Sequence, residues 1–278
     1  MKTLITAPAY FADEAVRTFK SFSSVQFVPS SKEMLLSFLS DCNVLAIRVD
    51  TVVDREVLDA APNLKVVATA TSGLNHIDME YAKEKGVKVI SLQGANTTST
   101  AEHVFALLFS LLRKVNAAHS HVLSGEWERH QFIGSNLSGK TIGVVGFGRI
   151  GQHVGDIAKA LGMKVLAYDP YLSDHVFAEK GAKEVSFEDL LRESDVVTSH
   201  MLLTEETEGM FCKDNFSLMK NGAVFVNCSR GGVVVEDDLL LALQEDVIAG
   251  AALDTFVREP ISKNHKFISY AKENDNLL

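Results

Sequence analysis

A glycine-rich turn at residues 146–151 is the strongest chemical pattern in the sequence. Residues 141–151 have the sequence TIGVVGFGRIG, in which an apolar run is followed by Gly146, Gly148 and Gly151. In a strand–turn–helix unit the first glycine makes the tight turn, the second lets the backbone approach a pyrophosphate, and the third lets the helix pack closely on the strand. The helix N-terminus then favours the anion through its free N–H groups and its dipole. The motif therefore predicts a dinucleotide site that also includes Arg149 and Ile150.

A carboxylate follows this turn at the sequence spacing expected of a ribose-binding residue. Asp169 lies in the sequence Tyr168-Asp169-Pro170, about 20 residues beyond the turn, as expected of the group that accepts hydrogen bonds from the ribose hydroxyls. An acidic group there repels a 2′-phosphate, so the sequence favours NAD over NADP. The alternative is that the glycines form only a tight turn and that Asp169 caps one.

Three further charged residues lie at the ends of apolar runs. Arg230 follows the run 223–228 and precedes two glycines, where a guanidinium can bind a carboxylate bidentately and polarise a keto oxygen. It could equally be a surface arginine in a strand-to-helix loop. Asp254 is the last residue of the run 248–254, and Glu259 lies in the loop after it. Both could instead cap the next helix.

The elements that position these residues form an α/β pattern. Many of the apolar runs are continuous rather than alternating, as in strands buried on both faces of a parallel sheet. Runs alternating with helical segments predict parallel sheets joined by right-handed crossovers. The predicted strands are 3–7, 44–49, 64–69, 87–92, 141–146, 165–169, 196–201, 223–228 and 248–254, and the clearest helices are 100–119, 150–161, 187–193 and 236–244.

Composition places the chain among globular proteins. Of its 278 residues, 46% are hydrophobic and 23% charged, and 36 acidic residues outnumber 27 basic ones. The formal net charge of -9 argues against a protein that mainly binds nucleic acid. No apolar run is long enough to span a bilayer, and the N-terminal apolar stretch is too brief for a signal peptide. Three scattered cysteines form no metal-binding pattern and suggest a cytoplasmic protein.

At about 150 residues per domain the length predicts two domains. A polar cluster at residues 96–99 precedes a long predicted helix, and Ser99 with Glu102 resembles a capping box. We therefore place the boundary there, with residues 1–97 as a substrate domain and 98–278 as an NAD-binding domain.

Six segments together resemble the D-isomer-specific 2-hydroxyacid dehydrogenase family, whose members include phosphoglycerate, D-lactate and erythronate-4-phosphate dehydrogenases. They occur in the family's order and cover nearly the whole chain. The segments are TSGLNHID at 71–78, NTTSTAEH at 96–103, GFGRIG at 146–151 with AYDP at 167–170, residues 200–209, VNCSRGGVVVE at 226–236 and AALDTFVREP at 251–260. The resemblance implies two Rossmann- or flavodoxin-like domains with a cleft between them.

The resemblance also implies roles for individual residues. Arg230 matches the family's catalytic arginine, and Glu259 the glutamate that orients a catalytic histidine and raises its pKa. Backbone amides of the Ser72-Gly73-Leu74 loop would bind the substrate carboxylate. The implied cofactor contacts outside the glycine turn are Ser72, Met201, Cys228, Ser229, Arg230 and Asp254.

The histidine itself is the difficulty. The family carries it in a Thr-Pro-His segment, at the end of a strand that here begins at residues 276–278, where the sequence stops. We therefore expect that the histidine and the family's C-terminal return to the first domain are missing by truncation. His265 lies in a polar stretch and is predicted to be a solvated loop residue, His200 to line the nucleotide site, and His76 to support the substrate loop indirectly. His103 and His153 are predicted to be structural.

The resemblance implies hydride transfer between NADH and a 2-keto acid, giving a D-2-hydroxy acid, with no metal. The commonest family members have Asp-Asn where this chain has Asn75 and His76, so the acid is left open. Trp127 lies in a connection, 125–138, that in relatives contributes to a dimer contact. Two alternatives remain: an NAD-binding scaffold or sensor, and an enzyme remnant of low activity.

Overall fold

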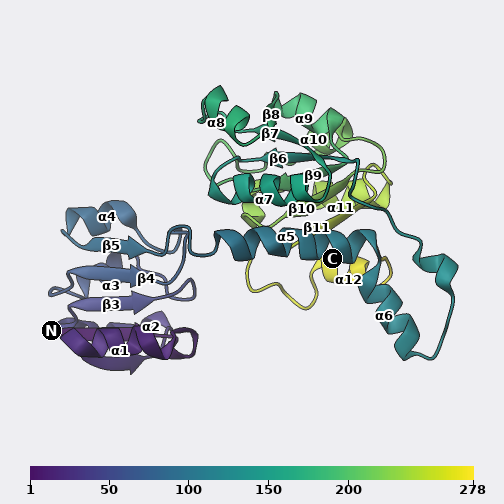
Figure 1. Cartoon of the computed structure of the whole chain (residues 1–278). Helices are drawn as coiled ribbons and strands as arrows, with labels where there is room; N and C mark the ends of the chain where they lie inside the picture. Colours follow the sequence, from purple (N-terminus) through teal and green to yellow (C-terminus); the bar gives the residue numbers. More distant parts are fainter. The chain divides into compact units, whose positions relative to one another are not determined.

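The chain folds into two compact units, Met1–Asn96 and Thr97–Leu278. The structure is a computed structural model that describes residues 1–278. Each unit has a parallel sheet covered by helices, which confirms the predicted α/β class (Figure 1). No helix combines the length and the apolar character needed to cross a membrane.

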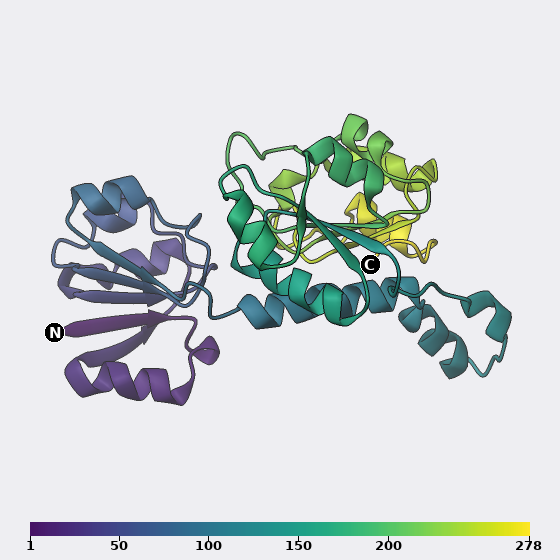
Figure 2. The ribbon, with the colours of Figure 1, turned by 45° about the horizontal axis from the view of Figure 1, so that its top comes forward.

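The first unit contains a five-stranded parallel sheet in the order β2-β1-β3-β4-β5, which is the flavodoxin-like order. Figure 2 shows helices on both faces of this sheet. Its strands are β1 (Lys2–Thr6), β2 (Ser24–Val28), β3 (Val44–Ile47), β4 (Val66–Thr69) and β5 (Lys88–Ser91). Its helices are α1 (Asp13–Phe22), α2 (Lys32–Leu36), α3 (Arg55–Asp59) and α4 (Met79–Glu84), with short 3-10 turns at Pro8–Tyr10 and Leu39–Asp41.

The second unit contains a six-stranded sheet in the order β11-β10-β9-β6-β7-β8. Numbered within this unit from its first strand, the order is 6-5-4-1-2-3, the Rossmann arrangement. Its strands are β6 (Thr141–Val145), β7 (Lys164–Tyr168), β8 (Lys183–Glu184), β9 (Val196–Ser199), β10 (Val224–Asn227) and β11 (Gly250–Leu253).

Helices cover both faces of the second sheet because alternate strand residues point to opposite sides. Val144 packs in one core with residues of α5 (Thr97–Leu112) and α7 (Arg149–Ala160). Val145 packs in another core with α9 (Phe187–Glu193), α10 (Lys213–Leu218) and α11 (Glu236–Gln244). The remaining helices of this unit are α6 (Val115–Leu123), α8 (Asp174–Glu179) and α12 (Lys266–Ala271), with 3-10 turns at Arg129–Phe132 and Gly231–Val233.

Residues 276–278 lie along the outer strand of this sheet. Ala251 in β11 forms a parallel bridge with Leu277. The amide of Ala251 donates to the Asn276 carbonyl at 2.8 Å, and the amide of Leu253 donates to the Leu278 carbonyl at 2.9 Å. The strand expected at these residues is therefore present as a single bridge.

Two local predictions about the long helix after residue 96 are wrong. A single helix was expected over 100–119, but Lys114 adopts a left-handed conformation with φ 50° and separates α5 from α6. The capping box is also absent, because α5 begins at Thr97 and Ser99 lies inside the helix. Residues 100–119 contain no glycine or proline that would have indicated the break.

Candidate active site

Four neighbouring strands of the second sheet end at the same edge, and each carries a predicted site residue into the following turn. In sheet order these strands are β6, β9, β10 and β11, and the residues after them are Gly146, His200 with Met201, Arg230 and Asp254. Strands β7 and β8 lie on one side of β6, whereas β9, β10 and β11 lie on its other side, so the strand order reverses between β6 and β9. Ligands of open α/β sheets bind at such a switch point, beyond the carboxyl ends of the strands.

The three glycines of the turn have different structural requirements. Gly146 has φ +87°, and a Cβ there would lie 2.8 Å from the carbonyl carbon of His200. A Cβ at Gly151 would lie 2.2 Å from the Gly146 oxygen, so any side chain would push the helix off the turn. A Cβ at Gly148 would meet nothing within 4 Å. Gly148 thus leaves open space above the first turn of α7, at a helix N-terminus whose free N–H groups favour an anion.

Asp169 closes this turn from the neighbouring strand. Its Oδ2 accepts a hydrogen bond from the Phe147 amide at 2.9 Å, and its Oδ1 accepts one from the Tyr171 amide at 3.1 Å. Each carboxylate oxygen has a second lone pair that can accept from a ribose hydroxyl. The carboxylate thereby links the glycine turn to the segment after β7.

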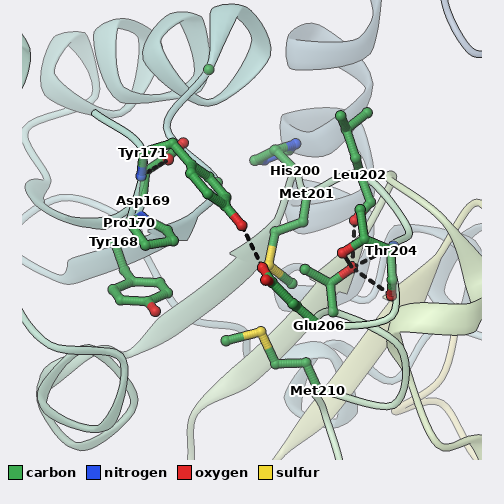
Figure 3. Close-up of a pocket in the computed structure, with 13 residues that line it drawn as sticks. Tyr168, Asp169, Pro170, Tyr171, His200, Met201, Leu202, Thr204, Glu206 and Met210 are labelled. Atoms are coloured by element: carbon green, nitrogen blue, oxygen red, sulfur yellow. Dashed lines mark hydrogen bonds between the residues drawn. The ribbon is translucent and has the colours of Figure 1, made fainter.

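A cavity of about 310 Å³ lies between this turn and the loop after β9 (Figure 3). Four predicted cofactor residues line it: Gly146, Gly148, Asp169 and Met201. The other predicted cofactor residues do not line it: Ser72, Arg149, Ile150, Gly151, Cys228, Ser229, Arg230 and Asp254. Residues that the sequence did not indicate also line it, namely Tyr171, Leu202, Thr204, Glu206, Thr207 and Met210. The cavity is large enough to take part of a nucleotide.

His200, which the sequence predicted to line the nucleotide site, lines this cavity. Its Nε2 is 3.0 Å from the Thr198 hydroxyl, while its Nδ1 is buried without a hydrogen-bond partner. Burial lowers the pKa of His200 to about 3, so the imidazole remains uncharged near neutral pH. A neutral imidazole offers one donor and one acceptor rather than a second positive charge.

Arg230 is fixed at the end of β10 by hydrogen bonds of its own turn. The Asn227 side-chain amide donates to the Arg230 carbonyl at 2.9 Å, and the Arg230 guanidinium donates to the Ser229 carbonyl at 2.7 Å. The Ser229 hydroxyl donates in turn to Asn227 Oδ1 at 2.7 Å. Cys228 is buried, and burial raises the pKa of its thiol to about 12. Cys228 is therefore an inert part of this turn.

Asp254 and Glu259 are both exposed in the segment after β11. Asp254 Oδ1 lies 3.3 Å from His103 Nε2, which projects from α5. Glu259 Oε1 accepts a hydrogen bond from the Phe256 amide at 3.0 Å. The sequence predicted only a structural role for His103, so this contact with a proposed cofactor residue was missed.

His265 contradicts the prediction of a solvated loop residue. Its side chain is only 20% exposed, it lies between Phe256 and Phe267, and its Nε2 is 3.1 Å from Glu236 Oε2. The other oxygen of Glu236 accepts a hydrogen bond from the Val257 amide at 3.0 Å. Glu236 and His265 together hold the segment that carries Asp254 and Glu259. The polar neighbours of His265 in the sequence concealed this packing.

The Ser72-Gly73-Leu74 loop follows β4 in the first unit. The Ser72 hydroxyl donates to Asn96 Oδ1 at 2.6 Å, and its oxygen also lies 3.1 Å from the Leu92 carbonyl oxygen. The Thr71 hydroxyl donates to the Gly73 carbonyl. His76 Nε2 is 3.1 Å from the Thr69 hydroxyl. The loop is thus held at both ends by side-chain hydrogen bonds. No group of three or more His, Cys, Asp or Glu side chains in residues 1–278 is arranged to hold a metal ion.

Comparison with known proteins relates this arrangement to one family. Residues 105–274 match the model of the D-isomer specific 2-hydroxyacid dehydrogenase NAD-binding domain. D-3-phosphoglycerate dehydrogenase of Archaeoglobus fulgidus is 40% identical over 270 residues, which cover 96% of this chain and 51% of that protein. The chain thus spans about half the length of these curated relatives.

Solved structures agree with the family model. The D-lactate dehydrogenase of Aquifex aeolicus, complexed with NAD and lactic acid, has a TM-score of 0.86 and 29% identity, over 99% of this chain and 86% of that one. An acyclic imino acid reductase in complex with NADPH and D-Arg has a TM-score of 0.88 and 27% identity, over 100% of this chain and 88% of the other. The chain belongs to the D-isomer-specific 2-hydroxyacid dehydrogenase family, and its second unit carries that family's NAD-binding domain.

Proposed function

We propose that the protein is an NAD-dependent dehydrogenase that interconverts a 2-keto acid and a D-2-hydroxy acid. The observation that carries this proposal is the position of Arg230. Hydrogen bonds within its turn fix Arg230 after β10, at the edge of the sheet where β6 carries the dinucleotide turn. A carboxylate-binding cation at the cofactor edge is what reduction of a keto acid requires.

Each proposed site residue has one task in this scheme. Bound NADH supplies the hydride. Arg230 binds the substrate carboxylate and polarises the keto oxygen, while the amides around Ser72, Gly73 and Leu74 bind the carboxylate as a nest of donors. Asp254 lies on the nicotinamide side of the cofactor, and Glu259 orients the proton donor.

Residues 1–278 contain no segment that matches the family's proton donor. None of the nine histidines occupies a Thr-Pro-His segment like that of the family's proton donor. We infer that the 278-residue chain binds NADH but reduces 2-keto acids slowly, because loss of a general acid reduces the rate about 10²–10⁴-fold. An NAD-binding scaffold or sensor is the alternative that the same observation favours.

The substrate and the assembly are proposed from relatives. A small anionic 2-keto or 2-hydroxy acid is the substrate class, since the similar proteins include a phosphoglycerate and a D-lactate dehydrogenase. A homodimer that uses the connection around Trp127 is the proposed assembly, and Trp127 is 68% exposed in the single chain. The proposed location is the cytoplasm, and all three cysteines are free.

A comparison of two arginine variants tests the catalytic proposal. NADH oxidation with a panel of 2-keto acids is followed for the wild type, Arg230→Gln and the control Arg192→Gln, which removes a surface arginine of α9. We expect Arg230→Gln to lower kcat/KM about 10²-fold or more while leaving NADH affinity within a few-fold. Equal turnover by both variants would refute the role of Arg230. NADH binding without turnover of any acid would favour the scaffold.

A further inference from the structure

The cavity beside the glycine turn contains a second carboxylate besides Asp169. Glu206 lines it from the loop after β9, whereas Asp169 lines it from the segment after β7. The loop that carries Glu206 is tied by its own hydrogen bonds, because the Thr207 hydroxyl donates to the Leu202 carbonyl at 2.6 Å and accepts from the Thr204 amide at 2.9 Å. The position of Glu206 is therefore set by a structured turn.

Tyr171 holds the Glu206 side chain toward the cavity. The two residues are 35 positions apart in the sequence, and the Tyr171 hydroxyl donates a hydrogen bond to Glu206 Oε2 (Figure 3). This hydrogen bond and the charge of Glu206 raise the pKa of Tyr171, and the charge of Asp169 adds to the effect. A tyrosine phenol is protonated at neutral pH, so it can donate to Glu206, and the charges of both carboxylates act on it.

The two carboxylates differ in how far they are neutralised. Asp169 accepts hydrogen bonds from two backbone amides, those of Phe147 and Tyr171. Such amide dipoles offset part of a carboxylate's charge. Glu206 is compensated by a single neutral phenol. No lysine or arginine lines this cavity, so a ligand inside it faces two negative groups and no cation.

We propose that Glu206, held by Tyr171, is a second specificity-determining residue of the cofactor site and acts with Asp169 to exclude a dinucleotide that carries a 2′-phosphate. The inference rests on the proposed function in that it takes this cavity to hold the adenosine half of the dinucleotide. A 2′-phosphate has a charge of about -2 near neutral pH. At a separation of about 8 Å and an effective dielectric constant of about 80, repulsion by one further carboxylate changes affinity about 5- to 6-fold.

The test uses dissociation constants for NADH and NADPH, measured by nucleotide fluorescence on the 278-residue chain. Glu206→Gln is the informative variant, and Glu205→Gln is its matched control because Glu205 undergoes the same charge change but does not line the cavity. We expect Glu206→Gln to strengthen NADPH binding about 5-fold and to change NADH binding less than 2-fold. Glu205→Gln should leave the ratio of the two constants unchanged.

A tyrosine variant separates the charge of Glu206 from its placement. Tyr171→Phe keeps the ring and removes the donor, so Glu206 is free to turn toward solvent and the preference for NADH should fall by a smaller factor. The double variant Tyr171→Phe/Glu206→Gln should match Glu206→Gln alone, because the phenol has no carboxylate left to hold.

The outcomes distinguish this inference from the proposed function. Equal ratios for Glu206→Gln and Glu205→Gln, with NADH still bound by the wild type, would overturn the role of Glu206 and leave the dehydrogenase proposal intact. Failure of the wild-type chain to bind NADH would overturn both. An effect of Glu206→Gln that persists undiminished in about 1 M salt would also contradict a repulsive mechanism, since such interactions are screened within about 3 Å there.

Discussion

Two adjacent glycines after Arg230 provide a sharp test of how the active-site turn is packed. A Cβ at Gly231 would lie 1.9 Å from the Phe256 carbonyl carbon and 2.3 Å from the Val257 nitrogen, both backbone atoms. A Cβ at Gly232 would meet only the side chain of Leu203, at 2.9 Å. Neither glycine has a positive φ. The same substitution thus meets a rigid obstacle at one position and a movable one at the next.

The expected magnitudes follow from these contacts. In Gly231→Ala the two backbones must separate by roughly 1.5 Å, and such overpacking costs about 1–3 kcal/mol. The movement also disturbs the Val257 amide bond to Glu236, worth about 1 kcal/mol. We expect the free energy of unfolding to fall by about 3 kcal/mol, or the Tm by about 6–12 °C for a unit of this size. Gly232→Ala should stay within about 1 kcal/mol of the wild type, because Leu203 can change rotamer and alanine restricts the unfolded chain.

Urea unfolding followed by far-UV circular dichroism gives the free energy of unfolding of both variants. These free energies can be compared if the m-value is unchanged. NADH titration of each folded variant then reports whether the glycine turn survives. Equal destabilisation by the two substitutions would refute the reasoning. So would a Gly231→Ala protein within about 1 kcal/mol of the wild type.

Three further predictions concern buried groups. Burial lowers the pKa of His200 from its usual value of about 6.5 to about 3, so the unfolded chain binds a proton that the folded chain does not. The free energy of unfolding should therefore fall by at most about 2 kcal/mol from pH 7 to pH 5, and His200→Asn should flatten that part of the urea profile. An unchanged profile in His200→Asn would contradict this assignment. Burial raises the pKa of Cys42 to about 11 and that of Cys228 to about 12, so both thiols should react slowly with iodoacetamide at pH 8. Mass spectrometry of the treated native protein should therefore find Cys212 modified first. Equal labelling of Cys228 would contradict this prediction. The Phe225 ring packs on Phe211 with centroids 4.6 Å apart. Phe225→Ala should therefore lower the free energy of urea unfolding by about 3–5 kcal/mol, and Phe225→Leu by less than half of that. Similar losses in the two variants would show that the aromatic cluster is not tightly packed.

Much of the fold could be predicted because buried parallel strands are continuous apolar runs. The predicted helices 187–193 and 236–244 coincide with α9 and α11. The strand β2 was missed because it is an edge strand with one buried residue, Val28, and it lacks an apolar run. The two-residue strand β8 is exposed and has no apolar signal at all.

The candidate site divides in a similar way. Glycine spacing indicated the turn and Asp169 because both are local to one β–α–β unit, from β6 through α7 to the end of β7. The contacts of Glu206 with Tyr171 and of His265 with Glu236 join residues 35 and 29 positions apart. Such contacts depend on which loops the strand order brings together, and no periodicity or spacing in one sequence reports that.

The pairing of residues 276–278 along β11 affects the behaviour of the protein in concentrated solution. β11 is the last strand of the six-stranded order, and an open strand there would present unpaired amides and carbonyls to a strand of any neighbouring molecule. Three residues occupy those groups through the bonds of Ala251 and Leu253. Loss of this pairing would expose a template for strand addition, so the segment protects the sheet edge although it is too short to be a strand by itself.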